Sequence, residues 1–588
     1  MGRYQSYGRK DVQWTLDGDS TFIGVDMLHE RSLLGPGYLA VSQNKRLRDG
    51  PAATRAGTTF PGDFNPAFED IIIGSLIYSN PTSDEVMLVA TRNATYIWQL
   101  QFGKDPIQVN LAAGQNTGTG TCRVEFVQAF DKVLMLRRFT LGQPTLVWDG
   151  DVTHTFDPIT LSTDGSKLVP TTWFGEPFEN RVLYYFAYGL LDFRTKFIMS
   201  DILDYTSYDE VFSVFRVSAA QSDQITRLLA YQKGAIIAFM RHSIFIIENF
   251  TVDPNQTTQR VLSNKVGNVG NKVPLLVGAE AFFLSEPGGF YKVSQVIQDQ
   301  IVTEPIPISR KIQPIIDNID WDRKDALGLD FVACSQSLGD YSYFAIPTKN
   351  ATGGANDAVL VYNTSTQEWE SAPDLWDDPN FRIDAMHVTR YDQARRLFAM
   401  DYVAQKIYLM YDSAIDSING NTLQIKDTIE TRGYTVGDPS SFKRFERAII
   451  GIRTADPQVI ITAISDGVDE ELEIASFTKD PTISYVHGRG PTGIDPDAPK
   501  LEDYTTGVEF DDFVIQDFSL LPVGDISILP AVSEISALQT KQQSLERFQV
   551  RQNGRWCSLR IQNSQGQCDV LGVGIEAIQI QEGIKTVA

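Results

Sequence analysis

Histidine, the side chain most often used to bind metals or move protons near neutral pH, occurs at five positions in this chain. The five are His29, His154, His242, His387 and His487. They form no HExxH or His-x-His pair, so a metal centre would need ligands that converge from distant parts of the chain. We therefore expect surface or packed histidines and predict no metal site.

The four cysteines are equally scattered, at Cys122, Cys334, Cys557 and Cys568. None belongs to a CxxC half-site, and four thiols in a chain of this length do not make a disulfide scaffold. We expect buried free thiols in a reducing compartment. A disulfide between Cys557 and Cys568 across a hairpin is the alternative.

The sequence carries no signature of nucleotide binding or of a nucleophile elbow. The stretch GNVGNK (267–272) lacks the four-residue gap and the closing Ser or Thr of a phosphate-binding loop, and no GxSxG elbow is present. With 74 carboxylates in the chain, a pair of catalytic carboxylates of a glycosidase stays an alternative, because the acid and the nucleophile can come from any two loops. We predict no catalytic residue, no cofactor and no enzymatic activity.

Composition indicates the kind of elements that carry these residues. The 33 Phe, 22 Tyr and 8 Trp, with 44 Gly and 27 Pro, favour aromatic-rich strands separated by turns. The net charge of −23 disfavours a protein that grips nucleic acid through its phosphates, since that task needs clustered Lys and Arg. The simplest role of so much negative charge is solubility.

No uncharged apolar run approaches the ~20 residues that a membrane span requires, so we predict no membrane span. The polar start of the chain also lacks the apolar core of a secretory signal.

One strand pattern recurs between residues 70 and 412, in which an aromatic residue stands among aliphatic ones and an acid or amide often follows. Neighbouring copies are 46 to 50 residues apart, with a single separation of 71. The aromatic markers are Trp98, Trp148, Phe197, Phe245, Tyr291, Tyr362 and Tyr408.

A spacing of about 40 to 50 residues is typical of four-stranded propeller blades. A single blade cannot bury both faces, so blades pack face to face around an axis until the ring closes. A β-sandwich, the alternative, predicts no steady period. We therefore predict an all-β fold with a propeller of about six to eight blades, and the repeats number seven.

The chain then divides into three regions. Residues 1–65 read as an N-terminal arm or linking segment, 66–430 as the propeller, and 431–588 as a C-terminal β-domain with an exposed loop at 485–504. Isoleucines at helical intervals predict a helical insertion near 305–328, which Pro314 should kink or split into two short turns.

Four stretches carry a resemblance to a known family. They are the leader GVDMLHERSLLGPGYLAVSQNKRLRDGPAATRAGT (24–58), the segment 264–293, LVYNTSTQEWES (360–371) and ETRGYTVGDPSSFKRFERAIIGI (430–452). In this order they resemble the tail nozzle and tail tubular proteins of short-tailed bacteriophages. The resemblance gives structural or assembly roles to Gly37, Asn44, Arg48, Gly50, Arg55, Gly57, Arg432 and Gly433.

The resemblance implies a structural protein of the virion tail, assembled in the cytoplasm of a host bacterium. Six copies would form a ring, the nozzle, attached to the adaptor or head-to-tail connector and portal and contacted by tail fibre or tailspike proteins. Genomic DNA would pass through its channel without specific binding during ejection. A lumen lined with carboxylates would repel phosphates, and the acidic stretches 467–473, 495–497 and 511–513 are candidates for that lining.

Two other functions fit a propeller of this composition. One is a secreted or surface protein that binds or cleaves carbohydrate, stacking sugars on Trp173, Trp369 or Trp376. The other is a tail hub, a stopper or a receptor-contacting tail protein.

Overall fold

The computed structural model of the 588-residue chain describes residues 15–47, 50–79, 85–138, 144–160, 167–168, 172–185, 194–209, 212–217, 223–249, 257–299, 305–325, 330–349, 356–455, 457–466, 472–478 and 542–579. The chain forms two compact units. Unit 1 comprises Met1–Ser20, Tyr434–Cys557 and Ile561–Ala588, and unit 2 comprises Thr21–Gly433 and Ser558–Arg560.

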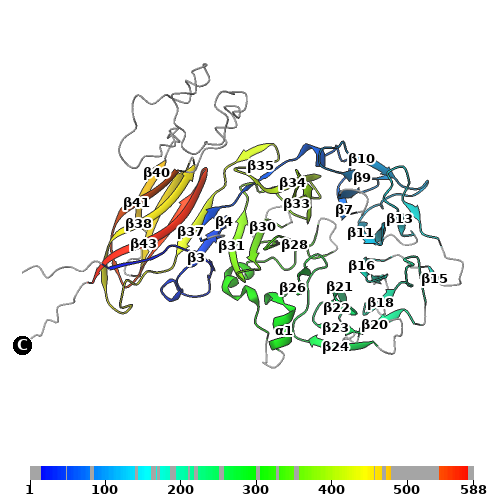
Figure 1. Cartoon of the computed structure of the whole chain (residues 1–588), viewed down its shortest axis with the longest axis horizontal. Helices are drawn as coiled ribbons and strands as arrows, with labels where there is room; N and C mark the ends of the chain where they lie inside the picture. Colours follow the sequence, from blue (N-terminus) through cyan, green and yellow to red (C-terminus); the bar gives the residue numbers. More distant parts are fainter. Residues whose placement is uncertain are drawn as a thin grey trace, which may run out of the picture. The chain divides into compact units, whose positions relative to one another are not determined.

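Unit 2 is a β-propeller, and its described residues form seven blades. Blades 1 to 4 follow one another in sequence, each as four antiparallel strands (Figure 1). Their strands are β7 (Ile72–Tyr78), β8 (Val86–Thr91), β9 (Tyr96–Leu100) and β10 (Ile107–Asn110); β11 (Arg123–Ala129), β12 (Lys132–Arg138), β13 (Leu146–Trp148) and β14 (Asp157–Pro158); β16 (Phe174–Phe178), β17 (Arg181–Tyr185), β18 (Lys196–Met199) and β20 (Val214–Arg216); and β21 (Ile225–Gln232), β22 (Ala235–Met240), β23 (Ile244–Glu248) and β24 (Thr258–Ser263).

Blade 5 has three strands in the described residues, blade 6 has four, and blade 7 takes its fourth strand from the N-terminal arm. Their strands are β25 (Leu275–Val277), β26 (Glu280–Ser285) and β27 (Gly289–Lys292); β28 (Cys334–Leu338), β29 (Tyr341–Ile346), β30 (Ala358–Asn363) and β31 (Glu368–Leu375); and β32 (Ala385–Tyr391), β33 (Ala394–Asp401), β34 (Lys406–Ser413) and β6 (Gly57–Thr59).

The ring is closed by neighbouring first strands and by β6. Strand β11 lies beside both β7 and β16, β16 beside β21, β28 beside both β25 and β32, and β32 beside β7. Strand β6 pairs with β34 of the last blade, with Gly57 opposite Ser413. The first and last blades are therefore joined both at the centre and at the outer edge of blade 7.

Apolar side chains fill each blade-to-blade interface, because alternate residues of a strand face opposite neighbours. In β12, Val133 and Met135 pack toward blade 1 while Leu134 and Leu136 pack toward blade 3. The described residues hold one apolar cluster for each of the seven interfaces, including the one between blades 7 and 1. The all-β propeller predicted from the spacing is confirmed.

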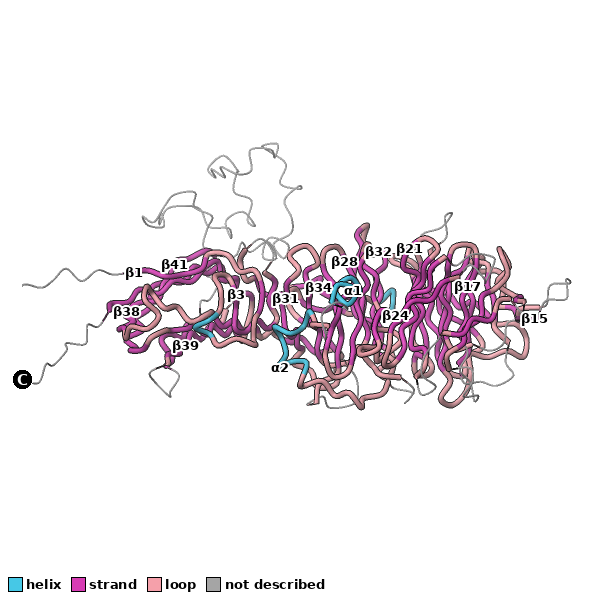
Figure 2. Tube along the Cα trace, turned by 90° about the horizontal axis from the view of Figure 1, so that it is seen from below, coloured by secondary structure: helices cyan, strands magenta, loops and turns pink. Residues whose placement is uncertain are grey.

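The positions of the aromatic markers explain why their separation in the sequence predicted the blade repeat. Each of the seven lies in the third strand of a different blade, from Trp98 in β9 to Tyr408 in β34. The long separation falls between blades 5 and 6, where α1 (Val293–Asp299), the 3-10 helix η5 (Ile308–Ile312) and α2 (Gln313–Ile316) are inserted. Figure 2 shows how few helices accompany the strands.

The segment expected as one arm contains short strands and is divided between the units. Strand β1 (Thr15–Asp19) belongs to unit 1. In unit 2 the arm provides β2 (Gly24–Val25), the 3-10 helix η1 (Arg31–Leu33), β3 (Tyr38–Gln43), β4 (Lys45–Arg46), β5 (Ala53–Thr54), β6 and the 3-10 helix η2 (Gly62–Phe64). Strand β3 pairs with β2 and with β37 (Asp427–Thr431), which follows the last blade and the hairpin of β35 (Asp416–Ile418) and β36 (Asn421–Leu423).

Unit 1 contains long antiparallel strands. One sheet has the order β1, β43 (Gln567–Gln579), β38 (Lys443–Ala455), β41 (Gln542–Gly554). Strand β39 (Gln458–Ser465) pairs with β40 (Leu472–Thr478) and neighbours β42 (Cys557–Asn563) in the second. In β38, Phe445, Ala448, Ile450 and Ile452 are buried while the intervening residues are not, the alternation of a sheet with one covered face.

Candidate functional site

The leader residues of the family resemblance lie where the arm meets the last two blades. Arg55, between β5 and β6, is fully buried and donates to both carboxylate oxygens of Asp416, at 2.7 and 3.0 Å. Its Nε donates to Asn44 Oδ1 at 2.9 Å, and the guanidinium lies 4.7 Å from the centre of the Trp376 ring. Because Asp416 follows blade 7 and Trp376 follows blade 6, Arg55 ties the arm to both blades.

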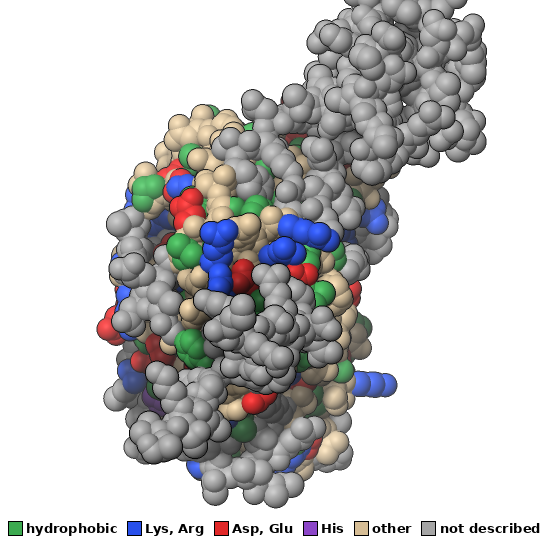
Figure 3. Space-filling view, turned by 90° about the vertical axis from the view of Figure 1, so that its left-hand side faces the viewer, with side chains coloured by type: hydrophobic (Ala, Val, Ile, Leu, Met, Phe, Trp, Pro, Cys, Tyr) green, Lys and Arg blue, Asp and Glu red, His purple; other side chains and the backbone are tan. Residues whose placement is uncertain are grey.

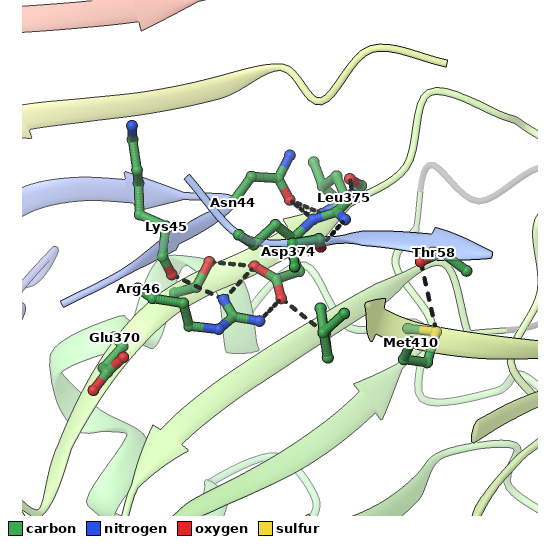
Figure 4. A network of polar contacts seen from close by, with 12 residues as sticks. Asn44, Lys45, Arg46, Thr58, Glu370, Asp374, Leu375 and Met410 are labelled. Atoms are coloured by element: carbon green, nitrogen blue, oxygen red, sulfur yellow. Dashed lines mark hydrogen bonds and ion pairs between the residues drawn. The ribbon is translucent and has the colours of Figure 1, made fainter. Parts of the chain in front are cut away.

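Asn44 has a left-handed backbone, with φ of 57°, which asparagine tolerates better than most residues. Its side-chain oxygen also accepts from the backbone N–H of Leu375 at 2.8 Å (Figure 4). Its side-chain amide donates to the carbonyl of Lys426 at 2.6 Å. One side chain thus fixes β31, the start of β37 and the arm together.

Lys45, directly after Asn44, forms a second buried pair. Its Nζ lies 2.6 Å from Asp427 Oδ1, and both side chains are only 1% exposed. Thr54 donates its hydroxyl proton to the same carboxylate at 2.7 Å. Strands β4 and β5 are therefore held against β37 by a charge pair closed to solvent.

Arg46 completes the cluster on the opposite face of β4. It donates to both oxygens of Asp374 at 2.6 and 3.0 Å and lies 4.7 Å from the centre of the Tyr411 ring (Figure 4). Burial of Asp374 opposes its ionisation, but Arg46 outweighs burial and holds the pKa of Asp374 below its usual value. Tyr411 donates to the same carboxylate at 2.8 Å, so Asp374 stays ionised and fully bonded.

Glycines of the leader occupy positions that a side chain would disturb. A Cβ on Gly57 would lie 2.0 Å from the backbone oxygen of Ile415, so only glycine allows β6 to approach this closely. Gly37 and Gly50 have φ of +80° and +98°. Arg48 lies outside the described residues.

The last two motif residues follow β37. Arg432 is half-buried, and the backbone N–H of Gly433 donates to the carbonyl of Arg31 at 2.8 Å. Arg31 and Arg560 both pair with the buried carboxylate of Glu430. Six of the eight motif residues, Gly37, Asn44, Gly50, Arg55, Gly57 and Gly433, thus have a specific geometric role in unit 2.

This cluster can hold strands together, but it offers no group for chemistry. Each cation at its centre already has a carboxylate partner, and of these six side chains only that of Arg46, at 15%, is more than 1% exposed. Breaking such a pair leaves one charge buried without compensation, which typically costs about 3–5 kcal/mol. We name these residues the closure cluster: Asn44, Lys45, Arg46, Thr54, Arg55, Asp374, Asp416 and Asp427.

A second polar cluster lies among the first strands of the blades, at the centre of the ring. Asp325 and Asp330 belong to the insertion between blades 5 and 6, yet both lie about 3 Å from Arg123 Nη1 of β11 in blade 2. Arg138 of β12 also pairs with Asp330 and stacks on Trp173, 4.2 Å from the ring centre. The insertion therefore reaches across the ring.

Arg227 of β21 bridges two blades that precede its own. It pairs with Glu125 of β11 at 3.2 Å and with Glu176 of β16 at 3.1 Å. Burial raises the pKa of Glu176 despite this partner. Three consecutive first strands are thus joined by one guanidinium.

Ser75 and His387 come from the adjacent first strands β7 and β32. Ser75 Oγ lies 2.7 Å from His387 Nε2 and 3.2 Å from the hydroxyl of Tyr402. Burial, followed by the nearby charge of Lys272, lowers the pKa of His387 to about 4. A serine beside an imidazole is the core of a nucleophilic triad, but among the described residues no carboxylate contacts this imidazole to complete one.

Other residues considered from the sequence have packing roles. Trp369 is buried and donates to the carbonyl of Ile308, and Trp376 donates to Thr58 Oγ1. All four cysteines are free and buried, as expected. Within the described part of the chain, no three His, Cys, Asp or Glu side chains come together as metal ligands would.

The acidic stretches proposed to line a channel lie outside the described residues, except for Leu472 and Glu473. None of the helices in the described ranges has the length and apolar character that a membrane crossing requires.

Sequence reasoning did not find the carboxylates of the closure cluster. Asp374, Asp416 and Asp427 lie more than 300 residues from their cationic partners. The available signal was weak: acids within a short run of strand-forming residues, as in DTIET (427–431), where two threonines and an isoleucine accompany Asp427 and Glu430. A buried acid in a strand needs a partner, but one sequence does not say which.

No protein-family model and no curated protein matches this sequence. Solved structures that resemble the fold include a catalytically inactive variant of virginiamycin B lyase from Staphylococcus aureus with quinupristin, at 11% identity and a TM-score of 0.35 over 59% of this chain and 97% of that one. Another is an exo-β-1,3-galactanase from Phanerochaete chrysosporium with galactose, at 8% identity and a TM-score of 0.26 over 89% of this chain and 100% of that one. At these TM-scores neither bears on the function, and the propeller assignment rests on the strand pairing and the seven interfaces.

Proposed function

We propose that this chain is a structural protein of a short-tailed phage tail, of the nozzle kind, and that it has no enzymatic activity. In the assembled particle, six copies would form a ring on the adaptor or head-to-tail connector. Tail fibre or tailspike proteins would contact this ring, and DNA would leave through its channel. The protein would be assembled in the host cytoplasm and act in the virion.

One observation carries the proposal. The leader residues that produce the resemblance are the ones that fix the arm to blades 6 and 7, through Arg55, Asn44 and Gly57. A leader so engaged serves mechanical closure of a propeller, which suits a protein that must withstand the passage of DNA. A carbohydrate-active propeller gives no reason for this leader.

Electron microscopy of the protein mixed with its particle, or with its neighbouring tail proteins, tests the proposal. Two-dimensional averages down the tail axis should show six propellers around an open channel. The control is the Arg55→Ala variant, which should be absent from the ring because its arm is released. Wild-type protein that never joins a tail under any condition would refute the nozzle function, and a glycan array would then test the carbohydrate alternative.

A further inference from the structure

Two buried carboxylates of blade 7 differ from those of the closure cluster. Asp384 directly precedes β32 and Asp401 ends β33, and their exposed fractions are 2% and 0%. Asp384 Oδ1 and Asp401 Oδ2 have no hydrogen-bond partner among the described residues. A buried carboxylate normally has a cation or a full set of donors, so these two oxygens are exceptions in this chain.

The other oxygen of each carboxylate holds the backbone at the end of β33. Asp384 Oδ2 accepts from the backbone N–H of Tyr402 at 2.9 Å. Asp401 Oδ1 accepts from the backbone N–H groups of Val403 and Ala404 at 3.0 and 2.8 Å. Because Tyr402 directly follows Asp401, both carboxylates lie against the same turn of the chain.

This turn belongs to the inner joint between the last blade and the first. The carbonyl of Tyr402 accepts from the backbone N–H of Ile72, the first residue of β7, at 3.0 Å, and β32 lies beside β7. On the side of blade 1, Arg92 and Asp70 pair with each other at 2.9 Å. The charges of blade 1 at this joint therefore neutralise each other, and the two carboxylates of blade 7 support the turn that blade 1 contacts.

Burial is the largest influence on both carboxylates, and it raises the pKa of each. Arg382 and Lys272 favour the ionised form of Asp384 but do not outweigh burial. Lys272 Nζ donates to the backbone oxygen of Asp384 at 2.7 Å. Asp325 of the insertion repels a charge on Asp384, and Asp384 in turn repels a charge on Asp401, whose pKa is raised to about 7.

The other titratable groups on the strands around the pair add no compensating charge. Burial raises the pKa of Cys334 on β28 and of Tyr408 on β34, and it lowers that of His387 on β32, so all three are neutral at pH 7. Lys406, opposite Asp401 in the register, donates to Asn419 Oδ1 at 2.7 Å. Two negative charges at this site would therefore lack partners.

We propose that Asp384 and Asp401 share one proton at neutral pH, and that this proton keeps the inner joint between blades 7 and 1 closed. One carboxyl group then donates to the carboxylate of the other, which gives both unpartnered oxygens a bond and leaves one negative charge instead of two. A proton fits this site better than a metal ion. No third His, Cys, Asp or Glu of the described chain joins the pair as a ligand, and Lys272 and Arg382 would repel a metal ion.

The shared proton makes stability depend on pH in a definite direction. An aspartate of the unfolded chain loses its proton near pH 4, whereas the folded pair keeps one until about pH 7. Between these values the folded state binds the additional proton, so the folded state loses stability as the pH rises. The unfolding equilibrium constant should increase roughly 50-fold between pH 5 and pH 7, and the dependence should end above about pH 8.

Urea denaturation of the full chain between pH 5 and pH 8 tests the proposal. Asp401→Asn places an amide N–H where the shared proton would be and keeps Oδ1 as the acceptor for the turn. Relative to this variant, the wild type should show the increase in the unfolding constant given above. Asp392→Asn removes the same charge at an exposed position of the same blade, and this matched control should follow the wild type.

A second variant distinguishes one shared proton from two independent groups. Asp384→Asn should remove the pH dependence as Asp401→Asn does, and Asp384→Asn/Asp401→Asn should remove no more than either substitution alone. Infrared spectroscopy of the wild type needs no variant to fold. The carbonyl stretch of a protonated carboxyl group should be present at pH 6 and absent at pH 9.

Hydrogen exchange tests the effect on the joint. At pH 8, after correction for the intrinsic rate, peptides from β7 and β32 should exchange faster in the wild type than in Asp401→Asn, and at pH 5 they should exchange equally. Equal exchange at pH 8 would mean that the proton does not hold the joint.

Four other results would overturn the proposal. They are parallel curves for the wild type and Asp401→Asn, additive effects of the two substitutions, no band of a protonated carboxyl group at pH 6, and destabilisation by EDTA of the wild type but not of Asp401→Asn. The last would mean that a metal ion joins the carboxylates. None of these measurements involves a tail, so this proposal and the proposed function can fail separately.

Discussion

Arg55 shows most clearly how a single side chain can decide whether the propeller closes. It is 0% exposed, and it is the cation that faces Asp416. Arg55→Ala should therefore lower the free energy of unfolding of unit 2 by about 3–5 kcal/mol, because the carboxylate would remain buried without its partner. Chemical denaturation monitored by tryptophan fluorescence measures this change.

An exposed pair provides the comparison. Arg395, 62% exposed, pairs with Glu85, and Arg395→Ala should change the free energy of unfolding by no more than ~1 kcal/mol. Arg55→Lys should fall between the wild type and Arg55→Ala, since an ammonium keeps a positive charge near Asp416 but loses the planar fork that bonds Asp416 and Asn44 together. Equal, small effects at Arg55 and Arg395 would contradict the role given to the closure cluster.

His387 predicts a pH dependence of stability. Burial and Lys272 lower its pKa from 6.5 to about 4 in the folded protein. As the pH falls from about 6.5 to 4, the unfolded chain binds this proton before the folded chain does, so the folded state loses stability, by at most about 3 kcal/mol. At pH 7 both states are neutral and the contribution vanishes.

The measurement compares the wild type with His387→Gln between pH 7 and pH 4.5, using urea denaturation at each pH. As the pH falls, the free energy of unfolding should decrease more for the wild type than for the variant. Because both proteins contain every other titrating group, the difference between them isolates the contribution of His387. If the free energies of unfolding of the two proteins changed in parallel with pH, the pKa of His387 would not be lowered by folding.

For single residues, the sequence indicated which positions have a structural role better than it indicated which residues they contact. Asn44, Arg55 and Gly57 were selected because they resemble a family leader, and each has a definite geometric role. Asp374, Asp416 and Asp427 were not selected, because a contact between residues more than 300 positions apart leaves no periodic trace in one sequence. The Ser75–His387 contact was missed for the same reason.

Among the elements, β6 is the strand on which ring closure depends. Gly57→Ala should prevent it from pairing with β34, because the added methyl would overlap the backbone oxygen of Ile415. We expect a loss of about 1–3 kcal/mol or more, with faster hydrogen exchange in blade 7. Gly62→Ala, where a methyl meets nothing within 4 Å, is the matched control and should leave both measurements unchanged.

Elements with strong local periodicity were predictable, and those defined by distant pairing were not. The third strand of every blade was recognisable in the sequence from an aromatic residue among aliphatic ones, from Trp98 to Tyr408. Strand β6, only three residues long, has no such pattern and is a strand only because β34 provides its hydrogen bonds. The helical insertion was predicted from isoleucine spacing, and Pro314 limits its α-helical part to the four residues of α2.

For the molecule as a whole, each described blade interface and the β-domain have their own apolar interior, and the described strands of the seven blades all lie between residues 57 and 413. Strands β40 and β41, which flank the segment 479–541, neighbour each other. Replacing 479–541 by a short Gly-Ser linker should therefore leave the melting temperature of the propeller unchanged. A propeller that unfolds at a lower temperature in this variant would show that the segment contributes to its stability.

The pairing of β6 with β34 also bears on how the protein is made. Gly57 leaves the ribosome early, but its partner Ser413 is added only 356 residues later. At elongation rates of about 5–20 residues per second this delay is roughly 20–70 s, during which the ring of blades is still open. A chain that ends before blade 7 cannot close its ring, because β6 then has no β34 with which to pair. Premature termination products would thus remain open and exposed to proteases, and only chains that extend through blade 7 would form the closed ring.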